Sequence, residues 1–237
     1  MSNETINTLR FWADTYNTVG FVERDPVQFP RRYTGVSAEI SGFITAWISF
    51  GNRKAIVEKA EYLNSCLLGR CPYLFISNRV FKSFELMDAK IYRMLSYRDF
   101  YELCDRLYYL YKDFNGMEDM IIKSGKAPLQ AICDYFQGIK GIPDYSKGSA
   151  CKRLCMFMRW MVRNDGIVDL GLWKQISPRD LIIPLDTHVH RVALDLGITR
   201  RKQPDMRTAK EVTEFFAGIY PDDPALGDFA LFGYGIH

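Results

Sequence analysis

The chain has 237 residues, of which 48% are hydrophobic and 14% aromatic, and its formal net charge at pH 7 is +3. This length fits one large domain or two lobes with a sizeable buried core, and the composition excludes a disordered protein. A net charge of +3 permits a nucleic-acid partner without requiring one, so the distribution of the basic residues matters more than their total.

No segment of the sequence has the character of a membrane anchor or a secretion signal. The longest apolar run, residues 43–50, is far shorter than the roughly 20 residues that span a bilayer. The first residues are polar and do not resemble a signal peptide. We therefore expect a cytoplasmic protein that has no membrane partner.

The cysteines do not form a recognisable metal-binding pattern. They lie at positions 66, 71, 104, 133, 151 and 155, mostly inside helical patterns, and neither close pair has the CxxC spacing of a zinc knuckle. The chain also has only three histidines. We expect the cysteines to be reduced and buried as small hydrophobic residues, and we expect no bound metal.

Hydrophobic periodicity predicts helices along the whole chain and no convincing strand, so the predicted fold class is all-α. The clearest stripe covers residues 36–48, and a Gly51-Asn52 turn follows it. The predicted helices occupy residues 4–17, 36–48, 56–67, 100–114, 128–138, 151–163, 186–196, 208–220 and 225–234, with short helices within 73–95 and near 173–176.

Asp186 lies at the start of a predicted helix, directly after Pro184 and Leu185. In a structural interpretation its side chain is an N-cap that accepts hydrogen bonds from free backbone N–H groups. In a functional interpretation the same donors keep the carboxylate ionised, which suits a group that faces a developing positive charge. Both interpretations use the same geometry, and the position of Asp186 alone does not separate them.

The helix predicted at residues 151–163 has an apolar face and a second face on which Lys152, Arg159 and Arg163 recur at helical spacing. A stripe of positive charge on a helix is usually a solvated surface. It is also the kind of face that contacts the phosphates of a nucleic acid.

Three features in this order resemble the helix-hairpin-helix DNA glycosylase superfamily. They are a helix pair that turns at Asn52, a glycine-punctuated hairpin that opens a helix with a lysine, and a Pro-Leu-Asp-Thr-His string at residues 184–188. The resemblance covers roughly residues 36–237. More closely, the strings Ser-Ala-Cys-Lys-Arg-Leu at 149–154 and Pro-Leu-Asp-Thr-His-Val at 184–189 resemble a bacterial family of unknown function related to archaeal 8-oxoguanine DNA glycosylases.

The resemblance implies a two-lobed, multi-helix glycosylase-like fold. Residues 36–140 would form a six-helix-barrel-like lobe, and residues 1–35 with 141–237 a second lobe whose hairpin lies at 141–163. The implied activity is removal of a damaged base, an oxidised purine such as 8-oxoguanine, from double-stranded DNA, with associated AP lyase activity. We expect a monomer without a cofactor, associated with the nucleoid.

The resemblance also implies the roles of individual residues in the chemistry. Lys152 would form a Schiff base with the sugar, and Asp186 would stabilise the positive charge that develops there. Lys147, in the hairpin, is the second choice for the nucleophile. If Lys152 is only a surface cation, Asp186 would activate water instead, and the enzyme would be monofunctional.

The remaining expected contacts concern DNA and the extruded base. Asn52 would fill the gap beside the orphaned base, although a Gly-Asn turn between packed helices is an equally simple interpretation. The other expected DNA-binding residues are Arg53, Gly141, Gly148, Ser149, Arg159 and Arg163. The base pocket would be walled by Trp47, Asp228, Phe229 and Phe232, for which a place in the core is the alternative.

The sequence departs from the superfamily pattern in two places. The hairpin at 141–148 is longer than the usual motif, and no cysteine follows Cys155, so the iron-sulfur cluster of some relatives is not expected. Two other functions stay open at this point. One is a non-catalytic helix-hairpin-helix module that binds nucleic acid, and the other is a related fold that binds a small molecule or a protein.

Overall fold

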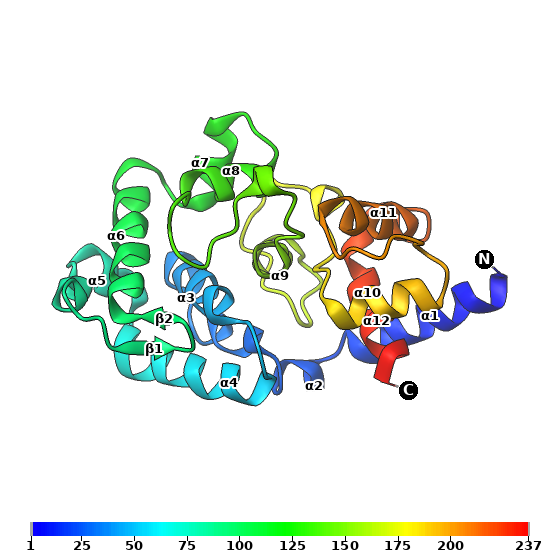
Figure 1. Cartoon of the computed structure of the whole chain (residues 1–237), viewed down its shortest axis with the longest axis horizontal. Coiled ribbons are helices and arrows are strands. Elements are labelled where there is room, and N and C mark those ends of the chain that lie inside the picture. Colours follow the sequence, from blue (N-terminus) through cyan, green and yellow to red (C-terminus); the bar gives the residue numbers. More distant parts are fainter. Residues whose placement is uncertain (1, 237) are drawn as a thin grey trace. The chain divides into compact units, whose positions relative to one another are not determined.

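The structure is a computed structural model that describes residues 2–236, and it is mostly helical, with 63% helix and 3% strand (Figure 1). The prediction of an all-α fold is therefore confirmed. The chain divides into two compact units. We call Arg24–Asp144 the central unit, and Met1–Glu23 together with Tyr145–His237 the terminal unit.

The central unit is built around helix α3 (Gly35–Ile48), in which residues 38–48 are all buried. A helix that is hydrophobic on all sides is covered on all sides. The elements that accompany it are η1 (Pro26–Gln28), η2 (Pro30–Arg32), α4 (Arg53–Glu61), the π-helix η3 (Tyr62–Leu68), α5 (Pro72–Ser77), η4 (Val80–Phe84), β1 (Lys90–Tyr92), β2 (Leu95–Ser96), α6 (Tyr97–Asp113), α7 (Met117–Ser124) and α8 (Pro128–Tyr135).

The central unit begins earlier than the lobe expected at residue 36. Pro26 and Pro30 start the short turns η1 and η2, which pack on α3 and α4. Val27 and Phe29, within these turns, are fully buried. Residues 24–35 therefore belong with α3 and not with the N-terminal helix, because their apolar side chains pack against α3 and cover part of its surface.

The terminal unit joins the two ends of the chain. Its elements are α1 (Asn3–Tyr16), α2 (Val19–Val22), η5 (Tyr145–Lys147), α9 (Lys152–Val162), η6 (Pro178–Asp180), α10 (Thr187–Asp195), α11 (Met206–Ala217), η7 (Pro224–Leu226) and α12 (Gly227–Ile236). Helix α12 packs along α1 and against α10 (Figure 1). Gly233 permits this close approach, because a Cβ there would lie 2.5 Å from the ring of Tyr16.

Several local predictions differ from the structure. The antiparallel pair β1–β2 was not expected, because strands of three and two residues are too short to show alternation. Helix α7 was also missed; it has eight residues, and glycines of positive φ, Gly116 and Gly125, flank it. The predicted helix near 173–176 is absent, although Trp173 and Ile176 are buried.

The cysteines are all free thiols, and their burial is uneven. Cys104, Cys133, Cys151 and Cys155 are buried as predicted, whereas Cys66 is exposed and Cys71 is half-buried. Among residues 2–236, no three His, Cys, Asp or Glu side chains are grouped so that they could hold a metal ion. In the same part of the chain, no helix is long and apolar enough to cross a bilayer.

Candidate functional site

Helix α9 begins at Lys152 because the preceding residue turns the chain into it. Cys151 is in the left-handed region, with φ of 50°, and its side chain is buried. Its N–H donates to Ser149 Oγ at 3.2 Å. Such a backbone conformation is costly for a residue with a Cβ and persists only where the surroundings hold it. Sequence reasoning missed this feature, since no residue pattern marks a cysteine of positive φ.

Asp186 is the N-cap of helix α10, as the structural interpretation predicted. Its Oδ1 accepts hydrogen bonds from the backbone N–H groups of His188, at 3.0 Å, and Val189, at 2.8 Å. These two bonds satisfy backbone donors that the first turn of α10 leaves without a partner within the helix. The cap occupies Oδ1.

The other oxygen of Asp186 faces the lysine that sequence reasoning paired with it. Lys152 Nζ lies 3.9 Å from Asp186 Oδ2, within the terminal unit. This is longer than the 2.7–2.9 Å typical of a direct charge-assisted hydrogen bond. The side chains are 34% and 40% exposed, so a ligand can reach both. The positive end of α9 repels the ammonium group, and the carboxylate offsets that repulsion.

His188, two residues after Asp186 in the chain, packs against helix α12. The ring of His188 lies 6.4 Å from that of Phe232, in an edge-on arrangement, and its Nδ1 lies 3.4 Å from Arg191 Nη2. A Cβ at Gly235 would lie only 2.4 Å from His188 Nε2. The close packing of α12 therefore restricts the ring of His188.

Arg159 and Arg163 do not lie on an exposed face, and the prediction that they contact DNA is corrected. Their side chains are only 3% and 2% exposed. Arg159 pairs with Asp169 and Asp228, and Arg163 pairs with Asp169 and, at 2.8 Å, with Asp223. Both guanidinium groups are already neutralised inside the terminal unit, so neither is available to a phosphate.

Three residues expected in a base pocket pack against other residues of the terminal unit. Phe229 is 1% exposed and lies 4.5 Å beneath the guanidinium of Arg159. Asp228 pairs with that guanidinium. Phe232 contacts Tyr16 edge-on, with ring centroids 5.3 Å apart. The alternative interpretation as core is correct for Phe229, whereas Asp228 and Phe232 are half-buried, and their place in a base pocket stays a prediction.

Trp47, the fourth expected pocket residue, is a core residue of the central unit, where it holds the start of the hairpin. It is 1% exposed, and its Nε1 donates to the carbonyl oxygen of Lys140 at 2.8 Å. Gly141 has φ of 88°, and a Cβ there would lie 2.8 Å from the same nitrogen. Gly141 is thus required for packing, whatever its role toward DNA.

The second half of the hairpin is bonded to the start of α11. The Gly148 carbonyl accepts from Met206 N at 3.0 Å, and Ser149 forms an isolated antiparallel bridge with Asp205. The Gly148 N–H donates to Tyr145 O at 3.2 Å, so it is not the phosphate donor that was expected. Lys147 is exposed at the end of η5.

Asn52 and Arg53 lie at the start of α4 in the central unit. Asn52 is the N-cap, and its Oδ1 accepts from Lys54 N at 2.9 Å. Arg53 is paired with Asp25 at 3.9 Å and is about half exposed. The interpretation of Gly51-Asn52 as a turn between helices is confirmed, and the role of Asn52 beside an orphaned base stays a prediction.

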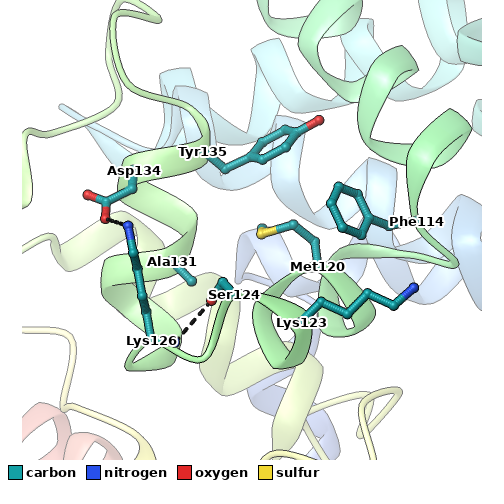
Figure 2. A pocket seen from close by; sticks show the side chains of 8 residues that line it. All are labelled: Phe114, Met120, Lys123, Ser124, Lys126, Ala131, Asp134 and Tyr135. Atoms are coloured by element: carbon teal, nitrogen blue, oxygen red, sulfur yellow. Dashed lines mark hydrogen bonds and ion pairs between the residues drawn. The ribbon is translucent and has the colours of Figure 1, made fainter.

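A pocket of about 330 Å³ in the central unit contains none of the predicted site residues (Figure 2). It lies at α7 and α8, and two lysines line it. Lys126 pairs with Asp134 at 2.7 Å, and Lys123 pairs with Asp119 at 2.8 Å. Both ammonium groups are balanced by carboxylates, so this pocket offers neither a surplus charge nor a reactive pair.

Comparison with known protein families gives a match over most of the chain. The model of a family described as "Protein of unknown function (DUF2400)" matches residues 25–237, a range that includes both Lys152 and Asp186. No match is found among curated proteins or among solved structures.

Proposed function

The chain belongs to this family of unknown function (DUF2400), and we propose that it is a DNA glycosylase of base-excision repair. Its substrate would be double-stranded DNA with a damaged base, an oxidised purine such as 8-oxoguanine, and it would also act as an AP lyase. The observation that supports this proposal is the 3.9 Å approach of Lys152 Nζ to Asp186 Oδ2. A residue that served only as a helix cap would need no such partner.

The chemistry of base removal explains why these two groups would act together. Breaking the bond between C1′ and the base leaves positive charge on the sugar, and an ionised carboxylate stabilises it. The neutral amine of Lys152 attacks C1′ while the base departs with the bonding electrons and takes up a proton. The 3.9 Å approach of Asp186 Oδ2 to Lys152 Nζ supports a role for this oxygen in accepting the proton that the ammonium must lose.

The lyase step follows from the same intermediate. After the sugar ring opens, the amine and C1′ form a Schiff base, whose positive charge makes a proton on C2′ acidic. Loss of that proton and cleavage of the bond between C3′ and its phosphate oxygen break the strand. Hydrolysis of the Schiff base then restores Lys152.

A second candidate function is a non-catalytic module that binds nucleic acid. The hydrogen bonds from His188 N and Val189 N to Asp186 Oδ1 favour it, because they give the carboxylate a complete structural role without any chemistry. This function predicts salt-sensitive DNA binding that survives Asp186→Asn and releases no base.

Borohydride trapping tests the proposal. Duplexes that contain 8-oxoguanine, other oxidised purines or an abasic site are incubated with the protein and reduced. We expect a covalent protein–DNA adduct that Lys152→Ala abolishes. Lys147→Ala is the matched control, since Lys147 is a second lysine of the hairpin and is exposed, and this variant should keep the adduct.

Each other result has a defined meaning. An adduct lost only in Lys147→Ala would assign the nucleophile to Lys147. Base release without an adduct would support a monofunctional enzyme in which Asp186 activates water. If no lesion gives either base release or an adduct, the glycosylase proposal is refuted, and the non-catalytic binding module is the function that is left.

A further inference from the structure

One short segment of the terminal unit is strongly basic. Residues 199–210, which run from the loop after α10 into α11, contain five cations and one carboxylate. The resulting net charge of +4 exceeds the +3 of the entire chain, so the remaining residues together carry no positive surplus. We call residues 199–210 the basic segment. Its cations are Arg200, Arg201, Lys202, Arg207 and Lys210.

Most of these cations are available to a ligand. Arg200, Lys202, Arg207 and Lys210 are exposed. Within residues 2–236, none of the four side chains forms an ion pair or hydrogen bond. They differ in this respect from Arg159 and Arg163, whose charges are buried against carboxylates. A phosphate could therefore bind the basic segment without first breaking an internal pair.

The fifth cation holds the basic segment in place. Arg201 donates from Nε to Thr208 Oγ1 at 3.0 Å and from Nη2 to Asp205 at 2.6 Å. Thr199 Oγ1 donates to Glu211 at 2.9 Å. Because these bonds order the backbone before any partner arrives, binding costs less conformational entropy.

Hydrogen bonds join the basic segment to both parts of the candidate site. His190 Nε2 lies 2.7 Å from the carbonyl oxygen of Arg201, and His190 belongs to α10, the helix that Asp186 caps. At the other end, Met206 N donates at 3.0 Å to the carbonyl of Gly148, four residues before Lys152. The segment is therefore continuous with the backbone that positions both site residues.

We infer that the phosphate backbone of duplex DNA binds to the basic segment, through Arg200, Lys202 and Arg207, and not to helix α9. This inference rests on the proposed function and names the surface that holds its substrate. Contacts of this kind set the position of a duplex without reading its sequence. They release counterions, so they make affinity depend steeply on salt concentration.

The test uses the full chain with Arg200→Gln, Lys202→Gln and Arg207→Gln combined. Affinity for a duplex with an abasic site is measured as a function of NaCl concentration. Each lost phosphate contact should reduce the slope of log K against log salt by about 0.9, so we expect a reduction of about 2 to 3 and at least a roughly tenfold weaker complex. Base release from a duplex that contains 8-oxoguanine is measured in parallel for the wild type and each variant.

The matched control removes three exposed cations from the central unit, as Arg70→Gln, Lys82→Gln and Lys90→Gln. It has the same net charge as the test variant, and it should keep the wild-type slope. The inference is overturned if the wild type and the test variant have equal slopes, or if the control variant loses as much slope as the test variant. It is also overturned if the wild type does not bind the duplex. A reduced slope without base release from any variant would support the docking surface and refute the glycosylase proposal.

Discussion

The two oxygens of the Asp186 carboxylate have different surroundings. Oδ1 caps helix α10, whereas Oδ2 faces Lys152 at 3.9 Å. A substitution can therefore separate the two roles. Asparagine caps a helix about as well as aspartate, because its side-chain oxygen accepts the same bonds, but it carries no charge.

We expect Asp186→Asn to keep the fold and to lose most of the proposed base-release activity. The free energy of unfolding should change by less than about 0.5 kcal/mol, because the cap is retained. The single-turnover rate of base release should fall on the order of 100-fold or more, because charge stabilisation in the transition state is lost. Urea unfolding and base release on a lesion duplex measure the two effects.

Asp195→Asn is the control for this prediction, since it removes an exposed carboxylate from the same helix. It should leave both quantities near their wild-type values. A wild-type rate of base release in Asp186→Asn would show that this carboxylate is only a cap.

At the scale of the element, helix α9 is held in the terminal unit by buried ion pairs as well as by apolar packing. Residues 154–162 are all buried, and the guanidinium groups of Arg159 and Arg163 meet at Asp169. Burial raises the pKa of Asp169 even though the two guanidinium groups oppose this shift. The carboxylate thus connects the loop after α9 to two positions of the helix.

We expect Asp169→Asn to be strongly destabilising, because it leaves two buried guanidinium groups with less compensation. Loss of one partner from a buried ion pair costs about 3–5 kcal/mol. Urea unfolding with the midpoint and slope both fitted measures this change.

Asp222→Asn provides the comparison. Asp222 pairs with Arg179 in the same unit, but the two side chains are 80% and 64% exposed, and such pairs contribute about 0–1 kcal/mol. If the two substitutions lower the free energy of unfolding by the same amount, the buried ion pairs of Asp169 contribute no more to stability than an exposed pair.

At the scale of the whole molecule, each unit has its own aromatic core. In the central unit Phe43 packs on Phe136, with ring centroids 4.5 Å apart. In the terminal unit Phe157 packs edge-on against Trp173, at 5.5 Å. Both phenylalanines are buried. The stability of each unit should therefore depend first on its own core.

Phe43→Ala and Phe157→Ala form a matched pair that tests this expectation. Each should destabilise its unit by about 3–5 kcal/mol through loss of apolar contacts and formation of a cavity. Hydrogen exchange should accelerate mainly in residues 24–144 for Phe43→Ala and mainly in residues 145–236 for Phe157→Ala. Equal acceleration in both units for both variants would show that the chain unfolds as one cooperative unit.

The sequence by itself determined the features that depend on near neighbours in the chain. Helical periodicity predicted the all-α class and most helices. Capping chemistry predicted that Asp186 is an N-cap and that the chain turns at Asn52. These features could be read because an N-cap bonds to N–H groups two or three residues away, and a helix repeats every 3.6 residues.

Only the tertiary structure decided which polar side chains meet water and which meet each other. Arg159 and Arg163 look like a solvated stripe in the sequence, and their carboxylate partners lie between 2 and 69 residues away. Lys152 and Asp186, 34 positions apart, come together because two helix starts converge within one unit. Periodicity identifies the faces of a helix, but the partner that covers a face comes from distant segments, and this is the physical reason that burial and the site geometry were decided by the fold.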